Sequence, residues 1–98
     1  MSAKVRLTAK AERDLREIYD YSFLRFGEDK ADAYLLGLDE KFRLLASKPE
    51  LGRRIDNIRA DYFRFEYVSH SVFYRRIEGG IQVVRILHKR MDYRLLFG

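Results

Sequence analysis

The side chains that could carry out chemistry gather in the C-terminal part of the chain. They comprise basic groups, one histidine and one carboxylate: Arg64, Arg75, Arg85, His88, Lys89, Arg90 and Asp92. A histidine can serve as general acid or base, and cations can stabilise a phosphate, so metal-free RNA cleavage is one chemistry to consider. Nearly any basic β-sheet would supply the same residue types, and the pattern is therefore a weak signal for catalysis.

Other catalytic motifs are missing from the sequence. There is no G-x-S-x-G elbow, no phosphate-binding G-x-x-x-x-G-K-[ST] loop, no G-x-G-x-x-G and no H-E-x-x-H. The chain has no Cys and 2 His, so a disulfide framework or a zinc site is not expected. His70 falls in an expected turn and is interpreted as a surface residue. No cofactor or metal is predicted.

Composition describes a small basic globular protein. The 98 residues, 47% hydrophobic and 36% charged, predict one domain spanning residues 1–98. The net charge of +5 is uneven, with 12 Lys/Arg and 11 Asp/Glu up to Asp56 but 8 and 4 after it. This excess suggests an anionic partner, either nucleic acid or an acidic protein. No leader-like or membrane-spanning apolar run is found, which favours a cytoplasmic protein without membrane contact.

The N-terminal half predicts one strand and two helices. Residues 4–7 alternate as a strand does, and Thr8 can cap a following helix. Its apolar stripe is Ala11, Leu15, Ile18, Ser22 and Phe26, with the charged residues from Glu12 to Asp20, Asp14 among them, on the other face. Gly27 ends this helix and Pro49 ends a second one, so the pair should form an antiparallel hairpin.

The C-terminal half predicts three strands over residues 62–68, 71–78 and 81–88, followed by a short apolar tail. Gly79-Gly80 is a hairpin-turn signal between the last two strands. Helices grouped before strands indicate an α+β fold, with a helical hairpin packed on a small, largely antiparallel sheet.

Both faces of this sheet carry apolar residues. Simple alternation places Ile81, Val83 and Leu87 on one face of the last strand, and Val84 and Ile86 on the other. The hairpin can cover one face. Either the tail, Leu95-Leu96-Phe97, folds over the second, or a partner segment covers that face or a groove beside the helices.

A set of short motifs runs through almost the whole chain. These are Leu7-Thr8-x-x-Ala11-x-x-Asp14-Leu15-x-x-Ile18-x-x-Tyr21, Phe26-Gly27, Ala33-Tyr34, Leu45-Ala46-x-x-Pro49-x-Leu51-Gly52-Arg53, His70-x-x-Phe73-Tyr74-Arg75 and Val84-x-Ile86-Leu87-His88-x-x-Met91-Asp92. In this order and at these intervals the sequence resembles the ParE-type toxins of the RelE/ParE superfamily, which belong to type II toxin–antitoxin systems.

The resemblance implies a protein that acts by binding and is not an enzyme. ParE-type toxins inhibit DNA gyrase by trapping it on cleaved DNA. A ParD-type antitoxin neutralises the toxin, and the complex reaches operator DNA only through the antitoxin. A partner of this kind would account for surplus apolar surface, by helix-in-groove and strand-addition binding, and for the basic charge.

The resemblance also suggests where these partners bind. The candidate antitoxin contacts lie on the helices and overlap the expected core: Leu15, Tyr19, Phe23, Tyr34, Leu38 and Phe42. At least half of them are expected to be structural. The candidate target-facing residues lie on the strands and the tail: Arg75, Arg85, His88, Lys89, Arg90 and Asp92.

The alternative is the other branch of the superfamily, the ribosome-dependent mRNA endonucleases. Those enzymes tend to have basic residues where this chain has Glu66 and Ser71, and a carboxylate would repel a phosphate. Tyr93, near the tail position that those enzymes use, keeps this alternative open. A plain nucleic-acid-binding module is a third possibility, and it predicts salt-sensitive binding of duplex DNA.

Overall fold

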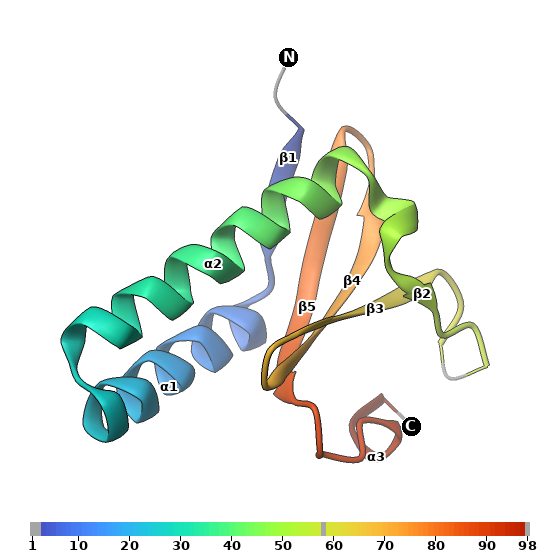
Figure 1. Ribbon diagram of the computed structural model, residues 1–98. Helices are drawn as coiled ribbons and strands as arrows, with labels where there is room; N and C mark the ends of the chain where they lie inside the picture. Colours follow the sequence, from blue (N-terminus) through green and yellow to red (C-terminus); the bar gives the residue numbers. More distant parts are fainter. Residues whose placement is uncertain (1–2, 58, 98) are drawn as a thin grey trace.

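Two helices lie against one face of a five-stranded sheet (Figure 1). The computed structural model describes residues 3–57 and 59–97. The elements are β1 (Lys4–Leu7), α1 (Ala9–Phe26), α2 (Glu28–Ser47), the 3-10 turn η1 (Pro49–Leu51), β2 (Arg53–Arg54), β3 (Tyr62–Tyr67), β4 (His70–Ile77), β5 (Gly80–His88) and α3 (Arg94–Phe97). This arrangement confirms the α+β fold with an N-terminal strand, a helical hairpin and a largely antiparallel sheet.

The sheet order is β1-β5-β4-β3-β2, so the first strand lies beside the last one. The β1–β5 pair is parallel and the other pairs are antiparallel. A parallel pair needs a long crossover connection, and here the helical hairpin is part of that crossover. The hairpin is therefore fixed at its start by β1.

Local signals in the sequence set the ends of the helices. The Thr8 hydroxyl accepts a hydrogen bond from the Ala11 amide at 3.1 Å and donates to the Val84 carbonyl at 2.9 Å. It therefore caps α1 and ties it to β5. Gly27 alone joins α1 to α2, with φ of 91° and ψ of 172°. That conformation is open to glycine and almost closed to other residues, so a one-residue hairpin is possible here.

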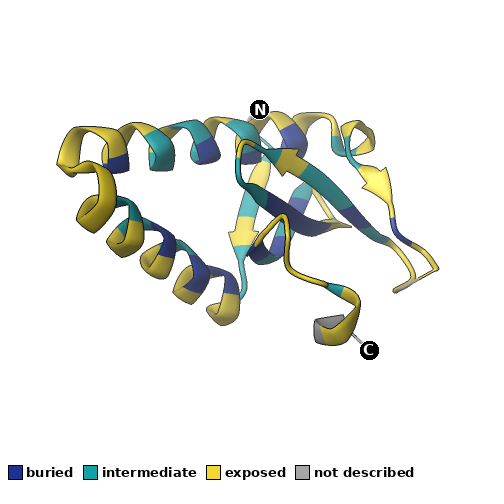
Figure 2. Ribbon diagram, turned by 60° about the horizontal axis from the view of Figure 1, so that its bottom comes forward, coloured by how far each residue is buried: buried dark blue, intermediate teal, exposed yellow. Residues whose placement is uncertain are grey.

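The main core lies between the helices and the face of the sheet that they cover, called the inner face. Its fully buried members include Leu38, Leu45, Val72, Tyr74 and Val83. A second, smaller core lies on the opposite or outer face, where Phe73, Val84 and Leu87 pack with Ile55. Figure 2 shows the buried residues concentrated on the strands and on the sheet-facing side of both helices.

A register shift in β5 overturns the predicted alternation. Phe73 pairs with Arg85 but Tyr74 pairs with Val83, so Val84 is an extra residue at a β-bulge. Beyond the bulge the faces exchange. Ile86 therefore joins the inner core, whereas Leu87 joins Val84 on the outer face.

The hairpin turn between β4 and β5 is displaced by one residue from the prediction. Ile77 pairs with Gly80, so the turn residues are Glu78 and Gly79, and Gly79 has a φ of 81°. Gly80 is already part of the strand. A Cβ atom at Gly80 would collide with the backbone of Lys4, so this glycine lets β1 approach β5 closely.

The outer core is covered from within the chain by Tyr93, and Leu95, the first of the three predicted tail residues, does not contribute. The ring of Tyr93 lies 5.0 Å from that of Phe73, and the Arg64 guanidinium lies over Tyr93 at 4.9 Å. Leu95 is 82% exposed. The side chains of Leu96 and Phe97 lie outside the described residues.

Candidate functional site: a groove beside the helical hairpin

The tip of the hairpin extends beyond the sheet (Figures 1 and 2). As a result, the apolar stripe of α1 is buried at Ala11 and Ile18 but not at its end, where Phe26 is 56% exposed. Tyr21 and Phe26 instead line a groove between the helices, the β3–β4 turn and the end of β5. The stripe therefore changes from core to surface along one helix.

The groove has a volume of about 790 Å³. Its walls combine apolar residues with a few charged and histidine side chains. They are Asp14, Glu17, Ile18, Tyr21, Ser22, Phe26, Lys30, Tyr34, Val68, Ser69, His70, Arg85, Ile86, Leu87, His88 and Met91. A large, open and mainly apolar concavity of this kind fits a bound segment or ligand.

Tyr34, His70 and His88 form one polar cluster in the groove. The Tyr34 hydroxyl lies 2.7 Å from His70 Nδ1 and accepts a hydrogen bond from the Ser69 amide at 3.3 Å. His70 pairs with His88 across β4 and β5, and their rings are 5.6 Å apart. Burial, helped by His88, lowers the pKa of His70, and burial raises the pKa of Tyr34. Both groups are therefore held in their neutral forms.

An ion pair joins α1 to β5 at the groove wall. Asp14 accepts from Arg85 Nε at 2.8 Å, from Arg85 Nη2 at 3.1 Å and from the Ile86 amide at 2.9 Å. Asp14 is buried, contrary to its predicted place on the charged face of α1, because it lies three residues after Ala11 and four before Ile18. The side-chain hydrogen bond that Arg85 donates to Asp14 raises the pKa of Arg85.

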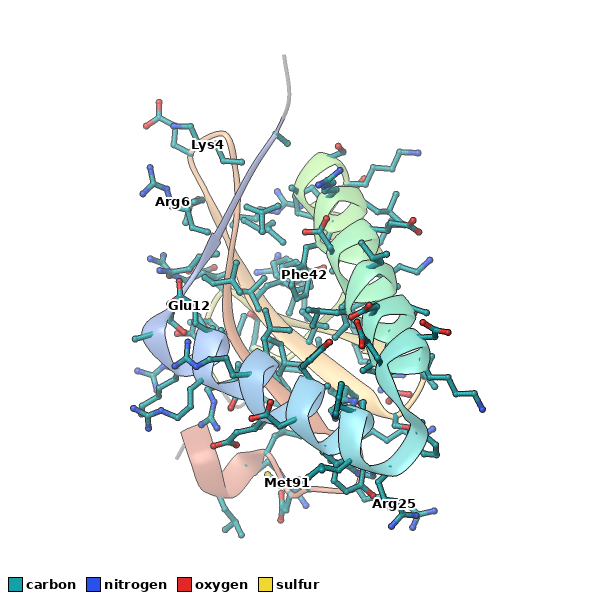
Figure 3. All side chains as sticks on the ribbon, turned by 90° about the vertical axis from the view of Figure 1, so that its left-hand side faces the viewer. Lys4, Arg6, Glu12, Arg25, Phe42 and Met91 are labelled. Atoms are coloured by element: carbon teal, nitrogen blue, oxygen red, sulfur yellow. The ribbon has the colours of Figure 1, made fainter. Side chains whose placement is uncertain are left out.

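The segment after β5 borders the groove. The Arg90 amide donates to His88 Nδ1 at 3.2 Å, and Met91 lines the groove itself. Asp92 accepts from the Arg94 amide at 3.2 Å and from Arg94 Nε at 3.1 Å, and this contact lowers the pKa of Asp92. Lys89 and Arg90 are exposed. Figure 3 shows Met91 near the end of the hairpin that carries Arg25.

The predicted target-facing residues are thus only partly brought together. Arg85 and His88 line the groove, and Lys89, Arg90 and Asp92 adjoin it. Arg75 lies apart on the outer face of the sheet, where its Nε donates to Gln82 Oε1 at 2.8 Å. Arg85 is held by Asp14, so it shapes the groove more than it faces outward.

The predicted antitoxin contacts divide between core and surface. Leu38 is 0% and Phe42 3% exposed, so both are core residues and are unavailable to a partner. Leu15 is half-buried against the same core. Tyr34 lines the groove, while Phe23 is exposed outside it. Tyr19 donates to Asp32 at 2.8 Å and links the two helices.

Several residues that line the groove were not predicted from the sequence. His70 was expected in a turn but begins β4, half-buried and bonded to Tyr34. Val68 and Met91 belong to short connections whose position no periodicity predicts. Asp14 could have been found, because a carboxylate within an apolar helical stripe signals a buried partner.

Metal chemistry finds no support in this groove. Among residues 3–57 and 59–97, no three His, Cys, Asp or Glu side chains are grouped so as to hold a metal ion.

No helix in that part of the chain is long and apolar enough to cross a membrane. The fold and groove define a small basic α+β protein, built as a helical hairpin on a sheet with a mainly apolar groove beside the hairpin.

Comparison with known proteins gives the family. The family model for the ParE toxin of the parDE type II toxin–antitoxin system matches residues 5–93. Toxin ParE1 of Mycobacterium tuberculosis is 42% identical over 93 residues, covering 94% of this chain and 95% of that protein. Toxin ParE1 of Caulobacter vibrioides is 36% identical over 93 residues, covering 95% and 96%. The chain belongs to the ParE toxin family of type II toxin–antitoxin systems.

A solved structure supports the same fold. A chain of the chromosomal ParDE system from P. aeruginosa matches with a TM-score of 0.73, covering 89% of this chain and 96% of that one. The sequence identity is 24%, so this likeness bears on the architecture. It confirms the helical hairpin and sheet predicted from the sequence.

Proposed function

We propose that this chain inhibits DNA gyrase in the cytoplasm and is neutralised by a ParD-type antitoxin bound in the groove. The observation that carries the antitoxin part is the groove itself. Tyr21 and Phe26 project from a helix into a concavity that has apolar residues on its other walls. An amphipathic helix can place its apolar face in such a groove.

The charges of the groove support a segment with an acidic side. Lys30 and Glu17 line it with opposite charges, and the exposed Lys89 and Arg90 adjoin it. Asp14 is already neutralised by Arg85. Basic groups at the rim would steer and align an acidic segment, while the apolar centre would supply most of the affinity.

The antitoxin proposal is tested with Phe26→Glu, compared with Leu24→Glu. Leu24 is on the same helix and 84% exposed, but it does not line the groove. Calorimetric titration with the ParD-type antitoxin should show at least a tenfold weaker affinity for Phe26→Glu and little change for Leu24→Glu. Equal affinities for the two variants would place the antitoxin elsewhere.

The gyrase proposal rests on membership of the ParE toxin family. Purified protein should inhibit supercoiling by gyrase and increase the amount of cleaved DNA. Replacing Lys89 and Arg90 by Gln should weaken this inhibition about tenfold if the end of β5 faces the target. Cleavage of mRNA on ribosomes with gyrase unaffected would instead support the endonuclease alternative.

A further inference from the structure

The outer face of the sheet carries basic side chains that the proposed function does not use. The register places four residues side by side across the strands β1, β5, β4 and β3: Arg6, Gln82, Arg75 and Tyr62. Their neighbours along the strands, Val5, Ile81, Val83, Tyr74 and Phe63, are in the inner core. Since successive side chains alternate between faces, this row lies on the outer face.

Further cations surround this row. Arg53 on β2 is in register with Arg64 of β3, whose own charge is balanced by Glu66, and Lys4 lies two residues before Arg6 on β1. The Arg59 guanidinium lies 5.6 Å from the centre of the Tyr62 ring. Figure 3 shows Lys4 and Arg6 pointing away from Phe42 and α2.

Carboxylates do not cancel the positive charge of the row. Glu66 is held by Arg64 at 3.1 Å, and Glu78 lies in the β4–β5 turn. Within the part of the chain that the structure describes, neither Arg6 nor Arg75 makes an ion pair with a carboxylate. Arg75 bonds Gln82 through Nε, which holds the side chain over the sheet.

The outer face lacks the features of a protein docking site. Protein interfaces are organised around an apolar centre with aromatic anchors. The apolar residues of this face, Phe73, Val84 and Leu87, are buried beneath Ile55 and Tyr93. The large apolar side chains that are exposed lie on helices, turns and the tail, and none of those described lies on a strand.

A polar, arginine-rich face without an apolar centre fits a polyanion whose charges repeat. Interfaces with nucleic acids are more polar and more positively charged than those with proteins, and phosphates supply most of the contacts. We propose that the outer face, through Arg6 and Arg75, binds the phosphodiester backbone of a nucleic acid. The toxin chain would then have a contact with nucleic acid that does not pass through its antitoxin.

The test uses the full chain and two fluorescent probes of mixed sequence, a single strand of about 20 nucleotides and a duplex of about 20 base pairs. Fluorescence anisotropy is measured over a salt series for wild type and for the double variant Arg6→Gln, Arg75→Gln. Each lost phosphate contact lowers the salt dependence by about 0.9 in logarithmic slope for duplex and about 0.7 for single strands. The logarithmic salt slope of the double variant should therefore be smaller by about 1.8 for the duplex or about 1.4 for the single strand. Its affinity at low salt should be at least tenfold weaker.

The matched control is Arg13→Gln, Arg16→Gln, which removes the same charge from the exposed side of α1. It should retain most of the binding, and the probe that responds identifies duplex or single strand as the ligand. Equal losses in both double variants, or no binding by wild type, would overturn the proposal. The proposal would also be overturned if polyglutamate displaced the probe as well as unlabelled nucleic acid of equal charge does. That result would indicate an acidic protein as the ligand.

Gyrase inhibition by the same variants is measured separately. If the chain binds nucleic acid but leaves gyrase unaffected, the proposed target is wrong and this inference stands. If gyrase is inhibited and nucleic acid is not bound, the proposed target stands and this inference is wrong.

Discussion

At the scale of single residues, the Asp14–Arg85 pair explains how a charged network can be part of the core of a basic protein. Asp14→Asn keeps the size of the side chain but removes the charge that Arg85 and the Ile86 amide share. We expect a loss of about 2–3 kcal/mol in the free energy of unfolding, because a half-buried guanidinium loses its partner. Urea denaturation measures this loss. The control is Asp20→Asn at an exposed position, whose free energy of unfolding should stay within about 0.5 kcal/mol of wild type. If the stability losses of Asp14→Asn and Arg85→Met simply add in the double variant, the two side chains do not stabilise each other and the prediction is wrong.

Tyr74 supplies a second prediction at this scale. Its fully buried hydroxyl donates to the Pro49 carbonyl at 2.6 Å and accepts from the Gly52 amide at 2.9 Å. Tyr74→Phe leaves both backbone groups without this partner, and unfolding should cost about 1–3 kcal/mol less. Chemical denaturation of this variant beside Tyr21→Phe, which alters an exposed ring, measures the difference. An unchanged stability would show that the hydroxyl is dispensable.

The same hydroxyl predicts a stability loss at alkaline pH. Burial raises the pKa of Tyr74 to about 12 from an ordinary 10.0. Above pH 10 the unfolded chain releases this proton while the folded chain retains it, so stability falls as pH rises toward 12. Denaturation from pH 9 to 11.5 should show a smaller decline for Tyr74→Phe than for wild type. Parallel pH profiles would contradict the assignment of this decline to Tyr74.

At the scale of elements, the one-residue connection between α1 and α2 depends on Gly27. Its φ of 91° and ψ of 172° lie outside the left-handed helical region that Asn tolerates. Gly27→Ala and Gly27→Asn should therefore each lower the free energy of unfolding by about 1–3 kcal/mol, and the melting temperature should fall with it. Ala33→Gly, at an exposed position of α2, should cost about 1 kcal/mol or less. Full tolerance of Asn together with a penalty for Ala would indicate that the connection relaxes to a left-handed turn.

The elements were predictable where a single period governs the chain. Apolar spacing and Gly27 predicted the hairpin, and the four predicted strands were correct to within a residue or two, whereas the two-residue strand β2 was not predicted. The prediction failed at Val84, because a bulge inserts one residue and reverses the faces beyond it. A groove beside the helices was among the predicted partner sites, but its lining was not predicted, because it joins Tyr21, Val68 and Met91 from segments far apart in sequence. Contacts of that kind depend on how far the hairpin extends past the sheet, and local periodicity carries no information about that.

At the scale of the whole molecule, the groove and the arginine row of the outer face are separated. The exposed apolar side chains are concentrated at the hairpin tip and groove, and Arg6 and Arg75 lie on the outer face of the sheet. The groove proposal and the outer-face proposal therefore concern different sides of the chain. Variants on one side can be expected to leave binding on the other side intact, as sites that share no contacts usually behave independently.

This separation leads to a prediction about neutralisation in cells. A toxin with Phe26→Glu should still arrest growth when expressed alone, but co-expressed antitoxin should rescue growth poorly, because the groove no longer accepts the apolar face of its partner. In purified form, excess antitoxin should raise the melting temperature of wild type, by an amount that grows with the logarithm of the antitoxin concentration, and raise that of Phe26→Glu much less. Leu24→Glu, with a comparable charge on the same helix, should behave like wild type in both assays. A Phe26→Glu chain that is rescued as fully as wild type would mean that the antitoxin neutralises this toxin from another surface.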